Sequence, residues 1–255
     1  MANASENNQE NKATLPKIHF VTYGNLKYAN AIQAIAAEAG RFPFDSINLF
    51  RETDLQQIPE FWDRHGEFVR THPRGNGYWI WKPFIIKKML LQMRDGDILV
   101  YADSGCSLDA SKMSRFCDYI NAAYNDPKGL VSFKLDQLQR KWTKMDTAIA
   151  LGGVDLENGT DTLGTCQISA TSFIICKRES TVKLIDDYYE NCCNYHLIDD
   201  SPSVVPNDPQ FIEHRHDQAV FSLLRHQYGG IMLSDETYPP GDPSCGPILA
   251  TRRRG

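Results

Sequence analysis

The sequence predicts a single α/β domain with a mostly parallel, doubly wound sheet and helices on both faces. Short runs rich in β-branched and aromatic residues alternate with segments whose apolar residues recur at helical spacing. Residues 97–102 (DILVYA) are almost entirely apolar, as in a central strand buried on both faces. The interior contains neither a repeat nor a linker-like segment, so we expect one domain over residues 17–250.

Each expected strand is a short apolar run bounded by turn-forming residues. The expected strands are residues 17–23, 46–50, 97–102, 130–133 and 172–176. The expected helices have apolar residues three and four positions apart. They are residues 28–39, 54–64, a helix that begins at Pro83 and ends at Gly96, and residues 111–124, 180–192 and 218–227. Residues 71–77 contain two glycines and a proline and predict a loop.

Two long segments, residues 137–164 and 195–214, show no clear period. Unstructured stretches of this length are uncommon in compact domains and usually serve as binding loops or lids. We therefore expect them to border a ligand site, with an acceptor entering beneath residues 195–214.

Composition excludes some functional classes. The net charge of −5 argues against a nucleic-acid partner, and Arg252 to Arg254 are expected to be a solvated basic tail within residues 251–255. Seven scattered cysteines with no CxxC pair predict reduced thiols and a cytoplasmic protein. Residues 1–16 predict a disordered lead-in, and no apolar stretch is long enough to span a membrane.

Asp103 gives the strongest local signal, because it directly follows the buried strand within ILVYADSGCS. In open α/β sheets, ligands bind beyond the carboxyl ends of the strands. A carboxylate there can hold a divalent cation or the hydroxyls of a ribose. The alternative is an ordinary aspartate in a strand-to-helix turn. Thr22 and Tyr23 end the first strand and are expected to lie near the base of a nucleotide.

Three blocks of sequence, in order, are GYWIWKP at residues 77–83, DILVYADSGC at residues 97–106 and HRHDQ at residues 214–218. Together they resemble a bacterial and viral group of glycosyltransferases with the GT-A fold, and more distantly the family of glycogenin and bacterial galactosyltransferases. The resemblance covers residues 17–232. It implies a hexosyl- or deoxyhexosyltransferase that moves a sugar from a nucleoside-diphosphate sugar, expected to be UDP-linked, to a hydroxyl of a saccharide or glycan. It leaves open whether the anomeric configuration is retained or inverted.

The resemblance also implies a divalent metal, Mn²⁺ or Mg²⁺, with a departure from the family pattern. In these relatives the strand ends in Asp-x-Asp, whereas this chain has Asp103, Ser104 and Gly105. The second acid is therefore missing. Asp103 could still hold a cation with His214 as a further ligand, or it could bind the ribose instead.

Other candidate residues follow from the resemblance, each beside a structural alternative. Asp217 is expected to contact the transferred sugar, although an acid at a helix start can simply cap it. Gln167 and His216 are candidates for the reactive face of the sugar, and a buried, hydrogen-bonded glutamine is the alternative for Gln167. Lys82 is expected to neutralise phosphate oxygens. Trp79 is expected either to stack on the donor or to pack in the core, and Lys144 either to reach the substrate or to be solvated.

Two competing functions remain open. A sugar nucleotidyltransferase would need a glycine-rich basic loop after the first strand, and TYGNLKY at residues 22–28 supplies little of one. An inactive homologue that binds carbohydrate or nucleotide sugar is the second, and the missing second acid motivates it. Hydrolysis of nucleotide sugars separates an enzyme from a binding protein.

Overall fold

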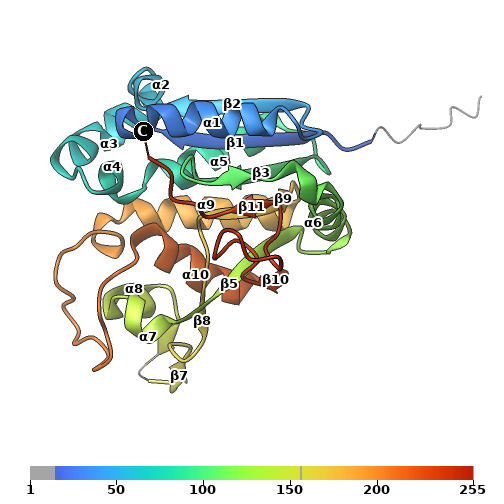
Figure 1. Cartoon of the computed structure of the whole chain (residues 1–255). Helices are drawn as coiled ribbons and strands as arrows, with labels where there is room; N and C mark the ends of the chain where they lie inside the picture. Colours follow the sequence, from blue (N-terminus) through green and yellow to red (C-terminus); the bar gives the residue numbers. More distant parts are fainter. Residues whose placement is uncertain (1–14, 156, 255) are drawn as a thin grey trace, which may run out of the picture.

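The computed structural model describes residues 15–155 and 157–254. It shows one α/β domain, in which a central sheet lies between two layers of helices (Figure 1). The fold class predicted from the sequence is confirmed. Most of the lead-in expected at residues 1–16 lies outside the described residues.

The main sheet has seven strands in the order β10-β5-β9-β3-β1-β2, with β8 also paired to β5. Their bounds are β1 (Ile18–Gly24), β2 (Ser46–Arg51), β3 (Ile98–Ala102), β5 (Leu130–Leu138), β8 (Cys166–Ile168), β9 (Ser172–Cys176) and β10 (Ile231–Ser234). Every residue of β3 and β9 is buried, as expected for strands in the middle of a covered sheet. All five predicted strands are present.

The pairing is mixed. The β1–β2, β1–β3 and β5–β10 ladders are parallel, whereas the β3–β9, β5–β9 and β5–β8 ladders are antiparallel. If the next strand of the sheet after β5 paired with it in parallel, the connection would need a crossover, usually a helix that packs along the sheet. Instead, the aperiodic segment after β5 folds locally into α7 (Gln139–Trp142), α8 (Met145–Ala150) and a hairpin of β6 (Val154–Asp155) and β7 (Thr160–Asp161). The chain then re-enters the sheet in the opposite direction.

Seven helices carry most of the packing. They are α1 (Ala29–Ala39), α2 (Glu52–Gln56), α3 (Pro59–Thr71), α5 (Trp81–Gln92), α6 (Met113–Asn125), α9 (Glu179–Cys193) and α10 (His216–Tyr228). The expected helix over residues 54–64 is two helices. Ile58 precedes Pro59 and is extended, because a proline disfavours helical geometry in the residue before it.

Side chains that alternate along the strands build a core on each face. Phe20, Val100 and Ile174 pack with α1 and α6, whereas Val21, Tyr101 and Phe173 pack with α5, α9 and α10. A two-stranded ladder of β4 (Ser107–Leu108) and β11 (Ile248–Leu249) extends the first of these layers. In the part of the chain that the structure describes, no helix has the length and hydropathy needed to cross a bilayer.

Candidate active site at the carboxyl edge of the sheet

Three predicted residues that are distant in sequence meet at the carboxyl edge of the parallel strands. Nζ of Lys82, in the first turn of α5, lies 3.3 Å from Oδ1 of Asp103 and 3.0 Å from Oδ2 of Asp217. Asp103 directly follows β3, and Asp217 lies in the first turn of α10. The Lys82 and Asp217 side chains are 3% and 5% exposed, whereas that of Asp103 is 31% exposed. Asp103 is thus the member of this ion triad that a ligand can reach.

The hydrogen bonds around Lys82 leave its ammonium no free donor. Its third contact is the carbonyl oxygen of Ala170, at 3.0 Å, and an ammonium has three N–H groups. We expected Lys82 to bind phosphate directly. Its burial and its three acceptors instead give it the role of holding two carboxylates in place.

Tyrosines orient both carboxylates. Tyr101 donates a hydrogen bond to Oδ1 of Asp103, the oxygen that also faces Lys82. Tyr188 donates to Oδ2 of Asp217, at 2.8 Å. Burial raises the pKa of both tyrosines well above the ordinary value, so they remain protonated donors. Within the described residues Oδ2 of Asp103 has no hydrogen-bond partner, so it can accept one from a ligand hydroxyl.

Lys82 attracts both carboxylates of the triad, whereas the charge of Asp103 disfavours ionisation of Asp217. Burial alone would lower the pKa of Lys82, but the attraction of Asp103 and Asp217 more than offsets it, and the pKa lies above the ordinary value. Burial raises the pKa of Asp217, while Lys82 and Tyr188 act in the opposite direction. The carboxylate of Asp217 makes no hydrogen bond to the N–H groups of its own helix, so capping does not account for it.

A left-handed turn directly precedes α5, the helix that carries Lys82. Residues 75–79, which include the short α4 (Gly75–Tyr78), all have positive φ, and three of them are not glycine: Asn76 at 57°, Tyr78 at 50° and Trp79 at 63°. Such backbone costs roughly 1–2 kcal/mol per non-glycine residue, so surrounding contacts must fix it. Trp81 donates from Nε1 to the carbonyl of Gly75, at 2.9 Å.

Aromatic residues, several of them predicted from the sequence, pack around this turn. The His216 ring stacks on Tyr78 and Trp79, with centroids 4.9 and 5.3 Å away. Tyr23, at the end of β1, stacks on Trp81 at 3.9 Å and accepts a hydrogen bond from Asn76. Trp79 and Tyr23 therefore belong to the packing around the turn.

Three further predicted positions lie at or near the ends of β1 and β3. Thr22 is fully buried, and its hydroxyl oxygen has no hydrogen-bond partner among the described residues. The Ser104 side chain is nearly buried and lies beside Gly24, where an added Cβ would be 3.3 Å from its Oγ. Gly105 lies against the last described residues of the chain.

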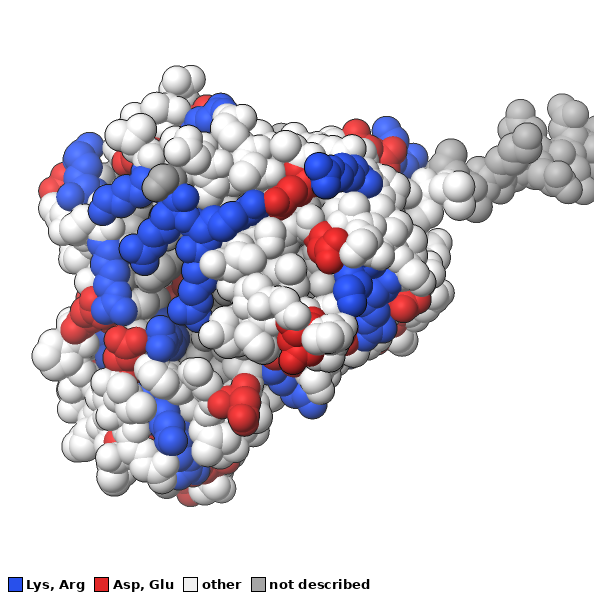
Figure 2. Space-filling model, viewed as in Figure 1, with Lys and Arg blue, Asp and Glu red and all other residues white. Residues whose placement is uncertain are grey.

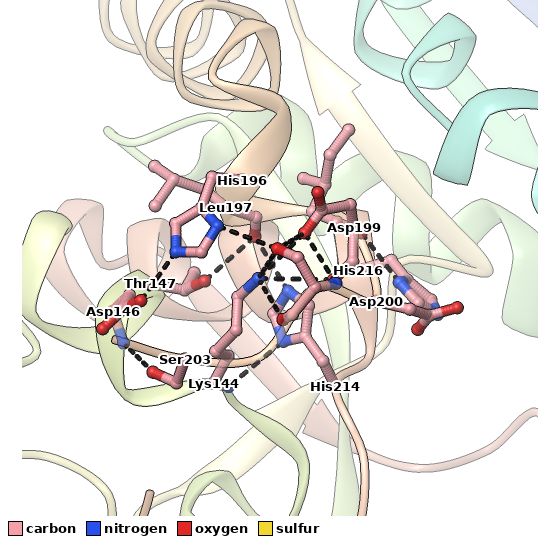
Figure 3. A network of polar contacts seen from close by, with 12 residues as sticks. Lys144, Asp146, Thr147, His196, Leu197, Asp199, Asp200, Ser203, His214 and His216 are labelled. Carbon is pink, nitrogen blue, oxygen red and sulfur yellow. Dashed lines mark hydrogen bonds and ion pairs between the residues drawn. The ribbon is translucent and has the colours of Figure 1, made fainter. Parts of the chain in front are cut away.

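The two long aperiodic segments bind each other (Figure 3). Lys144 is 2% exposed, and its ammonium lies 3.0 Å from Oδ1 of Asp199 and contacts Ser201. Asp146 accepts hydrogen bonds from His196, Val204 and Val205, which hold its pKa below the ordinary value although burial alone would raise it. Lys144 is therefore neither solvated nor directed at a ligand; it fixes residues 195–214.

His214 and His216 belong to the same network. Nδ1 of His214 accepts the backbone N–H of Lys144, at 3.1 Å, and its Nε2 donates to the carbonyl of Leu197, at 2.8 Å. Nδ1 of His216 donates to the carbonyl of Ile198, at 2.8 Å, and its buried Nε2 has no hydrogen bond within the described residues. Burial lowers the pKa of His214 to about 3 and that of His216 to about 4. Both rings are therefore neutral at pH 7.

Gln167 lies below the surface in a chain of amides. It accepts a hydrogen bond from Gln218, at 2.7 Å, and donates toward Gln139 and Thr143, at 3.2 and 3.1 Å. Its side chain is fully buried. The arrangement matches the structural alternative, in which Gln167 supports α10 next to Asp217.

The donor set at Asp103 does not fit a resident divalent cation. No group of three or more histidine, cysteine, aspartate or glutamate side chains that could hold a metal occurs among residues 15–155 and 157–254. Between Asp103 and Asp217, where two carboxylates would otherwise share a cation, lies the Lys82 ammonium. His214 makes its contacts with Lys144 and Leu197, and both of its nitrogens are used there.

Sequence reasoning missed two residues that orient the site carboxylates, and it assigned the wrong environment to Arg253. Tyr101 and Tyr188 read as core residues of β3 and α9, and only the fold shows that their hydroxyls reach carboxylates. Arg253 was expected to be solvated with its neighbours. Its guanidinium instead contacts Glu38 at 2.6 and 2.9 Å, because the chain end folds back over residues 105 and 106. No local pattern in a run of three arginines shows which of them is bound.

No protein-family model matches the chain, and no curated protein sequence matches it significantly. Solved structures with a similar arrangement include the galactosyltransferase LgtC in complex with donor and acceptor sugar analogues. It has 13% identity and a TM-score of 0.44, and the alignment covers 86% of this chain and 74% of that one. Mouse xyloside xylosyltransferase 1 has 13% identity, a TM-score of 0.41 and coverage of 87% and 86%. A 4-diphosphocytidyl-2C-methyl-D-erythritol synthase has 10% identity, a TM-score of 0.34 and coverage of 76% and 91%. At these values, the similarities say nothing about the chemistry of this chain.

Proposed function

We propose that this protein transfers a sugar from a nucleoside-diphosphate sugar, UDP-linked, to a hydroxyl of a saccharide or glycan. One observation carries the proposal. Asp103 stands at the carboxyl end of the central strand β3, fixed through one oxygen by Tyr101 and Lys82 and partly exposed. A carboxylate in this position, with its second oxygen free, is suited to accept hydrogen bonds from ribose or sugar hydroxyls.

In this proposal the triad positions the donor. A carboxylate that cannot rotate loses little freedom when a ligand binds, so its hydrogen bonds contribute fully to orientation. During transfer, the bond between the anomeric carbon and the diphosphate oxygen breaks, and its electron pair goes to that oxygen. The acceptor hydroxyl forms the new bond to carbon, and its proton passes to the departing diphosphate, directly or through water. Charge then builds on the diphosphate, and stabilising it is the main electrostatic task of the site.

Asp217 is assigned to the second position of the site, beneath Asp103. Its carboxylate shares Lys82 with Asp103 and is nearly buried, so it acts mainly through the geometry of the triad. Residues 195–214 lead toward α10 and are held by the contacts of Lys144 and Asp146, and we place the acceptor beneath them. The seven free cysteines suit a reducing compartment, and we place the protein in the cytoplasm.

The proposal is tested by measuring melting temperature with UDP- and GDP-sugars, followed by release of free sugar and transfer to saccharide acceptors. A ligand that binds the native state raises the melting temperature. We expect a shift with a nucleotide sugar, together with slow hydrolysis that Asp103→Asn abolishes. Binding without hydrolysis or transfer would favour the inactive binding protein instead.

A nucleotidyltransferase is less well supported by the site. After β1 the chain enters a single 3-10 turn, Leu26–Tyr28, whose start is capped by Asn25. This connection has no glycine-rich loop and one lysine, Lys27, so it offers little to hold a triphosphate. Formation of a nucleotide sugar from a nucleoside triphosphate and a sugar phosphate, in the absence of transfer, would reverse this ranking.

A further inference from the structure

The last described residues of the chain cross the loop that follows β3. We call residues 251–254 (TRRR) the arginine strap. The backbone N–H of Arg253 donates to the carbonyl of Gly105, at 2.8 Å, and the Thr251 hydroxyl donates to the same oxygen, at 2.9 Å. The Arg253 guanidinium contacts Glu38 and also donates to the carbonyl of Cys106. The strap is therefore fastened to the loop that begins at Asp103.

The strap explains why residue 105 is glycine. A Cβ at this position would lie 3.2 Å from the carbonyl oxygen of Arg253 and 3.5 Å from Cα of Arg252. The first distance is tighter than most real contacts of a Cβ, and both neighbours are backbone. A second acid at position 105 would therefore require the strap or the loop to shift by a few tenths of an ångström. The glycine at this position allows the strap to pack closely on the loop.

The strap also brings positive charge that is not neutralised. Arg252 and Arg254 are exposed, and within the described part of the chain neither side chain forms an ion pair or a hydrogen bond. Figure 2 shows Lys and Arg side chains gathered around a hollow on the face that bears the C-terminus marked in Figure 1. Lys82, by contrast, is already paired with two carboxylates. Arg252 and Arg254 therefore carry positive charge on a strap that is fastened to the loop beginning at Asp103.

We propose that the arginine strap is the diphosphate-binding element of the donor site and that it replaces a divalent metal ion there. The inference rests on the proposed function, because it assumes a nucleoside-diphosphate donor. A guanidinium presents a planar fork of N–H donors that matches phosphate oxygens and keeps its charge at any physiological pH. Arg252 and Arg254 contact the diphosphate, and Arg253 and Glu38 are positioning residues that hold the strap.

The test is binding of UDP, GDP, ADP, CDP, uridine and inorganic pyrophosphate, measured by calorimetry on the full chain in EDTA and then with Mn²⁺. We expect wild-type protein to bind at least one nucleoside diphosphate in EDTA. Arg252→Gln/Arg254→Gln should weaken that binding at least ~10-fold and leave uridine unaffected, because each charge-assisted contact contributes substantially. Both side chains are exposed, so the fold should persist, with an unchanged melting temperature as the check.

The matched control is Arg64→Gln/Lys183→Gln, which removes two exposed positive charges from α3 and α9 on the other face of the sheet. It should bind like wild type, so a loss that is equal in both double variants would overturn the inference. Glu38→Gln loosens the strap without removing an arginine, and it should lower diphosphate affinity by a smaller factor.

Two outcomes separate this inference from the proposed function. If wild type and the arginine double variant bind the diphosphate equally, and only with Mn²⁺, the strap inference is wrong and the donor site stands. If wild type binds no nucleoside diphosphate in either condition, the proposed function fails, and the inference fails with it. Gly105→Ala sharpens the result, because it adds a Cβ without a charge. A shift of the strap should cost affinity in EDTA, whereas unchanged metal-free affinity would contradict the packing argument.

Discussion

Lys82 and Lys144 are both buried lysines beside an aspartate, but they serve different regions. The Lys82 side chain is 3% exposed and that of Lys144 is 2% exposed. Lys82 joins the end of β3 to the start of α10, and its partner Asp103 keeps a free oxygen toward solvent. Lys144 joins two loops, and Oδ1 of its partner Asp199 also accepts the N–H and hydroxyl of Ser201.

The difference shows that a buried ion pair does not by itself mark an active site. Both pairs satisfy a buried ammonium, which would otherwise be costly. Of the two pairs, the Lys82 triad lies at the carboxyl edge of the central strands, where the Asp103 side chain is 31% exposed, against 20% for Asp199. The Lys144 pair uses its contacts to keep an irregular segment in one conformation.

The largest effect is expected from Lys82→Met, which leaves two carboxylates without their cation. Breaking a buried ion pair by removing one partner costs about 3–5 kcal/mol, and we expect a loss of this size in the free energy of unfolding. Transfer should also fall sharply. In urea titrations, Lys82→Met/Asp217→Asn should lose less than the sum of the two single variants; strict additivity would mean that the pair is not coupled.

Asp103→Asn and Asp199→Asn compare the two carboxylates directly. Asp103 is the more exposed, so Asp103→Asn should change the melting temperature by only a few degrees. Its transfer rate should fall at least ~100-fold, equivalent to ~2.7 kcal/mol of barrier, because a charged acceptor is lost. Asp199→Asn should show the opposite pattern, with lower stability and turnover of the folded fraction preserved. Similar rates for the two variants would remove the distinction between the regions.

Lys144→Met should have a smaller effect, roughly 2 kcal/mol of stability, because its partner Asp199 is 20% exposed and can be hydrated once the ammonium is removed. The loss should concentrate in residues 195–214. Hydrogen exchange is the suitable measurement: amides of this segment should exchange faster, while those of β1 and β3 keep their protection. Uniform acceleration across the sheet would show that Lys144 supports the whole fold.

Acid should weaken the loop region first. Burial lowers the folded-state pKa of His214 to about 3 and those of His216 and His65 to about 4. Their unfolded value is about 6.5, so below that pH the unfolded chain binds protons that the folded chain does not. The contribution of these rings to stability should be level above about pH 6.5 and fall as the pH drops from 6.5 toward 4. Urea midpoints across this range test it, and His214→Gln should reduce the slope.

The sequence predicts the scaffold better than the site. Apolar runs and helical spacing locate all five predicted strands, because burial imposes a period that is local in sequence. The direction of β8 and β9 was not predictable in this way, since it depends on where an aperiodic segment folds. Asp103 and Asp217 were recognised as candidates, but their shared contact with Lys82 is a product of tertiary structure.

The remaining corrections have a common physical origin. Lys144 and His214 lie in irregular segments, and Gln167 lies in the short strand β8. Polar residues at such positions either contact ligands or form hydrogen bonds with buried groups. Sequence alone does not distinguish these uses, because the residue types are the same. Here the loops are long and partly buried, so their backbone groups need internal partners, and these side chains provide them.

The Lys82 triad is complete only when the whole domain has folded. Its members come from α5, the end of β3 and the start of α10, so the contact between Lys82 and Asp217 encloses most of the domain. Such long-range contacts form only after the intervening chain has been ordered, which costs loop-closure entropy. A molecule that has built its first three strands but not yet docked α10 has Asp103 without the neighbour that shares its lysine. On the proposed function, we expect partly folded chains to be inactive, so a measurement of turnover would count only completely folded molecules.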